Sequence, residues 1–290
     1  MADSHAKTIQ IFLPTGEPRA IRVAELTTRI VQAVLIPRSD LAEAKKRGEL
    51  DHVAIYMLFG ELEEQAKPIV YIGQTEDVRK RLDSHNSTKD FWRTAVLGIS
   101  KTHSFTQVHI RYLEWYCIEK AKEVGRFALN NDQIPSKPFV TEPIEADLLD
   151  AFETLRTLVS TLGFPVFEPI VKQKSSGHFF LKGKDAEATG ELVEDGFVVH
   201  EGATARIEIV RSALQTVSSM RSKLIESDVL IEQNGDLKFT QDYLFNTPSG
   251  AAAVVLGRTA NGWIEWKDKN GNSLNDVKRT EPIDDEATSS

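Results

Sequence analysis

The 290-residue chain has little of what marks a secreted or membrane protein. It contains one cysteine, so no disulfide can form within the chain. No apolar run approaches the roughly 20 residues that a helix needs to cross a bilayer. No hydrophobic segment of the kind found in a secretory signal follows Met1. We therefore expect a cytoplasmic protein without membrane contacts.

Positive charge is also scarce, since the formal net charge is −8 at pH 7. Lys and Arg normally supply most of the affinity for nucleic acid, so this balance alone argues against such a partner. The acidic residues, however, gather at 185–201 and 281–286, whereas basic residues gather between 79 and 93: Arg79, Lys80, Arg81, Lys89 and Arg93. A small basic patch on an acidic protein predicts transient, salt-sensitive binding of nucleic acid.

Two short strings, Ala54-Ile55-Tyr56 and Tyr71-Ile72-Gly73, lie in apolar, β-favouring runs that a polar segment joins. This pattern predicts a β-hairpin. A helix is expected directly after the second string, with Thr75 as its N-cap. Arg81 and His85 are four residues apart and would project from one face of that helix. A phosphate would fit between this face and the hairpin.

The hairpin, the helix and a later glutamate resemble the GIY-YIG nuclease superfamily. Its motifs are a Gly-Ile-Tyr strand, a Tyr-Ile-Gly strand, a helix with Arg and often His, and a helix with a metal-binding Glu. The resemblance covers roughly residues 50–131 and departs from the pattern at Ala54, where the family has glycine. It implies an α+β nuclease core in which helices flank a small antiparallel sheet.

The resemblance also implies a role for each of five residues: Tyr56 as general base, Tyr71 to orient water or phosphate, Arg81 as phosphate ligand, His85 as hydrogen-bond partner, and Glu114 as metal ligand. A phenol has an ordinary pKa of about 10, so Tyr56 would need a lowered pKa, with Arg81 and the metal as the available cations. We expect Mg²⁺, which commonly takes only one or two protein carboxylates, with Mn²⁺ as a substitute. The predicted substrate contacts are Arg79, Lys80 and Lys89, with the family's distal asparagine at Asn130 or Asn131.

Each of these residues taken singly has a plainer interpretation as a packed, capping or solvated side chain. Their order and spacing from Tyr56 to Glu114 favour the nuclease. We therefore predict a Mg²⁺-dependent endonuclease that hydrolyses phosphodiester bonds in nucleic acid, with DNA as the expected substrate. The alternative is a non-catalytic nucleic-acid-binding or adaptor protein that retains the fold.

Four regions are predicted along the chain: a strand and helix preface at 1–50, the nuclease domain at 51–170, a smaller α+β module at 178–280, and a disordered tail at 281–290. Within them we expect helical content at 21–37, a strand at 106–110, a helix at 111–125 and a linker at 172–177. The string around Trp263 and Trp266 is strand-like. Residues 245–267 resemble a module appended to bacterial GIY-YIG proteins and DNA-modification enzymes.

Overall fold

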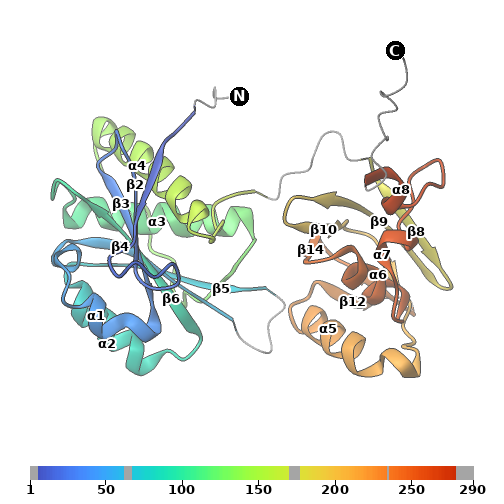
Figure 1. Ribbon diagram of the computed structural model, residues 1–290. Coiled ribbons are helices and arrows are strands. Elements are labelled where there is room, and N and C mark those ends of the chain that lie inside the picture. The colour runs from blue at the N-terminus through green and yellow to red at the C-terminus, as the bar shows by residue number, and fades with distance from the viewer. Residues whose placement is uncertain (1–5, 62–66, 170–176, 234, 279–290) are drawn as a thin grey trace, which may run out of the picture. The chain divides into compact units, whose positions relative to one another are not determined.

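The computed structural model describes residues 6–61, 67–169, 177–233 and 235–278 (Figure 1). These residues form two compact units that divide after Pro169. Each unit combines helices with a β-sheet, so the predicted α+β class is confirmed. Among the described residues, no helix is both long enough and apolar enough to cross a membrane.

The first unit is built on a seven-stranded sheet in the order β1-β2-β3-β6-β4-β5-β7. Neighbouring strands are antiparallel except β5 and β7, which are parallel. The strands are β1 (Ile9–Phe12), β2 (Arg22–Leu26), β3 (Val31–Pro37), β4 (Ala54–Gly60), β5 (Ile69–Thr75), β6 (Trp92–Ser100) and β7 (Ala128–Leu129).

Helices cover both faces of this sheet, as Figure 1 shows. One face packs against α1 (Leu41–Ala44) and α2 (Val78–Thr88), and the other against α3 (Gln107–Val124) and α4 (Glu142–Thr161). Short 3₁₀ turns at Arg38–Asp40 and Gly48–Asp51 flank α1. Two separate apolar cores result, one on each side of the sheet.

Residues 6–50 supply three strands, β1, β2 and β3, of the same sheet as the hairpin of β4 and β5. The helical content predicted for 21–37 is wrong, because this stretch forms β2 and β3, and β3 pairs directly with β6. Val34 and Ile36 face one core while Ala33 and Leu35 face the other. A strand buried on both faces gives a continuous apolar run whose periodicity cannot be told from that of a buried helix.

The strand predicted at 106–110 is also wrong, because this segment is the start of α3. Thr106 is the N-cap, and a capping box joins it to His109. The Thr106 backbone N–H donates to His109 Nδ1 at 3.2 Å. This local hydrogen bonding favours a helix where side-chain alternation suggested a strand. The helix therefore begins at Gln107 and still carries Glu114, as predicted.

The second unit holds another sheet, in the order β12-β13-β11-β9-β10-β14, with β8 paired to β9. Its strands are β8 (Phe179–Gly183), β9 (Ala186–Val193), β10 (Gly196–Val199), β11 (Thr204–Ala205), β12 (Leu230–Gln233), β13 (Asp236–Phe239) and β14 (Tyr243–Phe245). Its helices are α5 (Leu214–Glu226), α6 (Pro248–Leu256), α7 (Gly262–Glu265) and α8 (Leu274–Lys278), with a 3₁₀ turn at Arg211–Ala213.

The strand-like interpretation of the Trp263 and Trp266 string is wrong, since Trp263 lies in the short helix α7. Trp266 is completely buried in the core, and its indole N–H donates to the Pro248 carbonyl at 3.1 Å. Trp263 is partly buried against the same core, so both indoles contribute packing. The predicted linker at 172–177, apart from Gly177, and the predicted tail at 281–290 lie outside the described residues.

Candidate active site

The hairpin of β4 and β5 brings the two tyrosine strings together, as predicted. Tyr56 lies opposite Gly73 in the antiparallel register. A Cβ atom at Gly73 would lie 2.5 Å from the Tyr56 hydroxyl oxygen and 3.0 Å from the Tyr71 ring. Glycine is therefore needed here so that the two phenols can share one face of the sheet, a role that its place in the string could have suggested.

Helix α2 directs Arg81 and His85 toward this face. Its N-cap is Asp77, whose side chain accepts from the Lys80 backbone N–H at 3.0 Å. The prediction of Thr75 as the cap is wrong by two residues, because the Thr75 hydroxyl accepts from the Asp77 N–H instead. One turn apart on α2, Arg81 and His85 then both reach Tyr56.

A hydrogen-bonded cluster joins four of the predicted residues. Arg81 Nε donates to the Tyr56 hydroxyl oxygen at 2.8 Å, and an Nη of Arg81 donates to the Tyr71 oxygen at 3.4 Å. The Tyr56 oxygen also lies 2.8 Å from His85 Nε2. Depending on its tautomer, His85 Nε2 either accepts from the Tyr56 O–H or donates to the second lone pair of the phenol oxygen.

The electrostatics of this cluster differ from the prediction for Tyr56. The phenol is 0% exposed, and burial raises its pKa well above the ordinary value, although the hydrogen bond and charge of Arg81 oppose the shift. Arg81 therefore does not produce a phenolate. Burial, and then the charges of Arg81 and Lys89, lower the pKa of His85 to about 4. At neutral pH the cluster holds a neutral phenol and a neutral imidazole.

Glu114 comes from α3, on the opposite face of the sheet from α2. Its side chain is half-buried, and burial raises the pKa of the carboxyl group. A backbone hydrogen bond from Gln74 and the charges of Arg81 and Arg111 act in the other direction. The carboxylate thus lies near the end of β5 and within electrostatic reach of Arg81, while its charge remains incompletely compensated.

The two asparagines separate into different roles. Asn130 Oδ1 accepts from Lys89 Nζ at 3.2 Å, and this ammonium lies 4.5 Å from the centre of the Tyr71 ring. Asn131 instead binds β5, accepting from the Ile72 N–H at 3.1 Å and donating to the Ile72 carbonyl at 2.7 Å. Lys89 and Asn130 therefore join the cluster, whereas the amide of Asn131 is occupied by the sheet.

Two other predicted substrate contacts lie apart from the cluster. Arg79 donates to the carbonyls of Lys45 at 2.7 Å and Arg47 at 2.8 Å and forms an ion pair with Asp51. Its guanidinium ties α2 to the segment after α1, so a contact with substrate, which stays a prediction, would require these interactions to open. Lys80 is exposed on α2.

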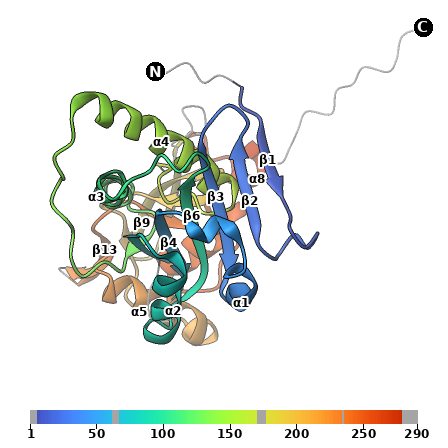
Figure 2. The same cartoon turned by 90° about the vertical axis from the view of Figure 1, so that its left-hand side faces the viewer.

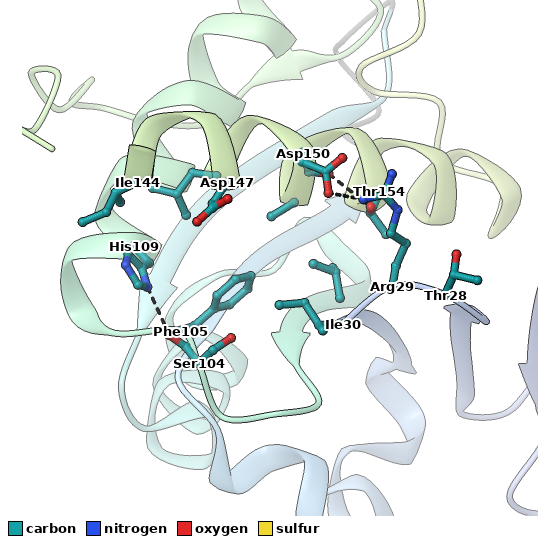
Figure 3. Close-up of a pocket in the computed structure, with 13 residues that line it drawn as sticks. Thr28, Arg29, Ile30, Ser104, Phe105, His109, Ile144, Asp147, Asp150 and Thr154 are labelled. Carbon is teal, nitrogen blue, oxygen red and sulfur yellow. Dashed lines mark hydrogen bonds and ion pairs between the residues drawn. The ribbon is translucent and has the colours of Figure 1, made fainter. Parts of the chain in front are cut away.

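A cavity of about 650 Å³ lies elsewhere in the first unit, between the β2–β3 turn, the β6–α3 loop and α4 (Figure 3). Phe105, Ile144 and Leu148 contribute apolar walls, and the ion pair of Arg29 with Asp150 lies at its side. None of the predicted site residues lines this cavity. The cluster around Tyr56 is therefore a separate feature of the fold.

Comparison with protein families agrees with this arrangement. Residues 52–124 match the family described as the GIY-YIG catalytic domain. The chain carries a GIY-YIG domain. The matched segment contains Tyr56, Tyr71, Arg81, His85 and Glu114. Residues 179–278 match a second family, the domain of unknown function DUF4357, in agreement with the predicted C-terminal module.

The GIY-YIG match implies nuclease activity in general and hence a nucleic-acid partner, and nucleases of this family commonly use divalent metals. A search of curated proteins and a search of solved structures find no match.

Proposed function

We propose that the chain is a Mg²⁺-dependent endonuclease that hydrolyses phosphodiester bonds in DNA. The observation that carries this proposal is the cluster in which Arg81 and His85 both contact the Tyr56 hydroxyl inside the GIY-YIG domain. Tyr71 and Glu114 complete the proposed catalytic set, with Lys89 and Asn130 as substrate contacts.

In the proposed reaction, Arg81 turns from the phenols onto the scissile phosphate, which its planar guanidinium suits. This movement is required because Tyr56 is completely buried, so an attacking water reaches its oxygen only after Arg81 has moved. With His85 in the tautomer whose Nε2 accepts, the water's proton passes to the Tyr56 oxygen as the phenol proton passes to Nε2. The water oxygen bonds to phosphorus, the P–O bond to the leaving sugar oxygen breaks, and that oxygen takes a proton from solvent. The half-buried Tyr71 orients the water.

Substrate binding should also increase the basicity of His85. Its low pKa results from burial and from the charges of Arg81 and Lys89. When these cations pair with phosphate oxygens, their effect on the histidine is reduced and its pKa rises. His85 Nδ1 is buried with no hydrogen-bond partner among the described residues, so an imidazolium is unfavourable without substrate. The acceptor is therefore weak until a phosphate arrives.

Glu114 is the residue proposed to hold Mg²⁺. Among the described residues no group of three or more His, Cys, Asp or Glu side chains could hold a metal. A single carboxylate fits Mg²⁺, which keeps several waters and takes substrate oxygens. A bound cation would also compensate the charge of Glu114, which burial disfavours by raising the pKa of the carboxyl group. The bound ion would supply Lewis-acid stabilisation of the phosphate charge.

The alternative function is a nucleic-acid-binding or adaptor protein that retains the fold without catalysis. The complete burial of Tyr56 favours this alternative, because a phenol held closed by Arg81 and His85 could serve only to stabilise the hairpin. The two functions differ in whether phosphodiester bonds break, so a cleavage assay separates them.

For the test, purified protein is incubated with labelled single-stranded, duplex and flap DNA and with RNA, with Mg²⁺, with Mn²⁺ and with EDTA. We expect cleavage of DNA with either metal. EDTA should abolish it, because the proposed reaction needs the metal and a site with Glu114 as its one proposed protein ligand cannot hold the metal against a chelator. Cleavage in EDTA would remove the metal from the proposal. Binding without cleavage under every condition would establish the alternative.

We further propose that the C-terminal unit recruits nucleic acid. It has its own core, and none of the proposed catalytic residues lies in it. A protein that ends at Lys172 should cleave at a similar maximal rate but with weaker apparent affinity. Its binding should also depend less steeply on salt, because fewer phosphates are neutralised. Equal affinity and equal salt dependence would instead assign residues 178–280 to stability or to protein partners.

A further inference from the structure

A loop beside the proposed site connects β7 to α4. Residues 130–141, here named the strap, connect β7 to α4 without forming a helix or strand. Figure 2 shows the strap passing outside α3 on its way to α4. It begins at Asn130, whose Oδ1 accepts from Lys89, the lysine that covers the Tyr71 ring.

The strap is held at both ends and stiffened between them. Asn131 makes two hydrogen bonds to the backbone of Ile72. Toward the other end, Lys137 Nζ donates to Glu145 of α4 at 2.7 Å. Pro135 and Pro138 restrict the backbone between these anchors, because proline fixes φ. The strap can therefore present a side chain to solvent at little entropic cost on binding.

Phe139 is the side chain that the strap presents. It is 89% exposed, the largest value among the exposed large hydrophobic residues. The next residue, Val140, packs against the core under α3 and α4, so this part of the strap is fixed on the protein while Phe139 points outward. Leaving a phenyl ring in water forgoes the free energy of burying it, which makes an exposed ring on an anchored segment a candidate contact surface.

The strap's contacts with the proposed site make a substrate strand the expected partner of Phe139. Lys137 Nζ lies 5.2 Å from the centre of the Trp115 ring, and Trp115 follows Glu114 in α3. The strap itself carries one acid and one base, Asp132 and Lys137, so it offers no net charge for binding phosphates. Phosphate contacts would come from the neighbouring site, and the strap would add an aromatic surface.

We propose that Phe139 stacks on an unpaired nucleobase of the bound strand, so that the substrates of this nuclease contain single-stranded or unpaired nucleotides. An aromatic ring can stack on any base whose face is open, but within a duplex both faces of each base are covered. The proposal rests on the nuclease function above, because it requires that the strand bound near Glu114 and Lys89 continues over the strap.

The test measures binding in EDTA, where cleavage plays no part. Fluorescence anisotropy compares the full chain with Phe139→Ala, Phe139→Trp and the control Ile134→Ala on single-stranded, flap and blunt duplex DNA. Ile134 is also on the strap and is 46% exposed, but it has no aromatic face. We expect Phe139→Ala to weaken binding to single-stranded and flap DNA by about 5- to 150-fold, the usual range for one stacked base, with little change for duplex.

Phe139→Trp should keep the affinity of the parent, and Ile134→Ala should resemble the parent on all substrates. Equal binding of single-stranded DNA by Phe139→Ala and the parent would overturn the proposal. An equal loss on single-stranded and duplex DNA would also overturn it, because stacking requires an open base. Selective binding in a protein that cleaves nothing would reject the nuclease function and leave the strap's role intact.

Discussion

Replacing Glu114 with Gln is expected to lower the cleavage rate by roughly 10³-fold or more, because the change removes the only proposed anionic metal ligand and a bound ion contributes several kcal/mol of charge stabilisation. Nucleic-acid binding in EDTA should be unchanged. The measurement is single-turnover cleavage at saturating protein, with Glu119→Gln as the control. Glu119 is an exposed carboxylate on the same helix, so its replacement changes the net charge equally without touching the proposed site.

Stability distinguishes this prediction from a structural role of Glu114. Burial raises the pKa of this carboxyl group in the folded protein, so the charged form is disfavoured there. The charged carboxylate therefore lowers the free energy of unfolding at pH values above the raised pKa, and this cost is relieved as the pH falls through it. Glu114→Gln should therefore melt at an equal or higher temperature than the parent at pH 7 without metal. A lower melting temperature together with normal cleavage would assign Glu114 to packing alone.

The same shift predicts the pH dependence of metal binding. Mg²⁺ requires the carboxylate, so its affinity should decline at a higher pH than for an ordinary glutamate. Mg²⁺ titration of the parent at several pH values measures this decline.

Local patterns predicted the parts of the site that depend on neighbouring residues. The hairpin of β4 and β5 follows from two apolar, β-favouring runs joined by a polar segment, and the helical turn from Arg81 to His85 follows from the spacing of four. The central strands β3 and β6 could not be read in this way. Both pack against cores on two faces, as β4 does, and a continuous apolar run alone does not distinguish a strand from a buried helix.

The roles of individual side chains depended on packing between distant segments. Arg79 and Arg81 are equivalent by sequence, but the carbonyls of Lys45 and Arg47 engage Arg79 and leave Arg81 for the phenols. Similarly, the pKa of Tyr56 follows from its complete burial between the sheet and α2. The engagement of Arg79 and the raised pKa of Tyr56 both arise from tertiary contacts, so the residue types and their spacing could not predict them.

Replacing Arg81 with Ala is expected to reduce the cleavage rate by about 10²- to 10³-fold, which corresponds to about 3–4 kcal/mol for one electrostatic donor in the transition state. Arg81→Lys should recover only part of this loss, since an ammonium lacks the planar pair of donors. Arg79→Ala is the matched control from the same helix. It should lower the melting temperature through the lost contacts to Lys45 and Arg47 but leave the cleavage rate of the folded protein unchanged.

Tyr56→Phe completes this test, because it removes the proposed proton acceptor while keeping the ring. We expect a loss of about 10²- to 10⁴-fold in the single-turnover rate, the usual contribution of a general base. Some stability should also be lost, since Arg81 Nε and His85 Nε2 each lose a partner. Tyr243→Phe, which removes a buried hydroxyl from the other unit, controls for that effect and should cleave normally. If Tyr56→Phe cleaves at the rate of the parent while Tyr71→Phe does not, the half-buried Tyr71 rather than the buried Tyr56 accepts the proton of the attacking water.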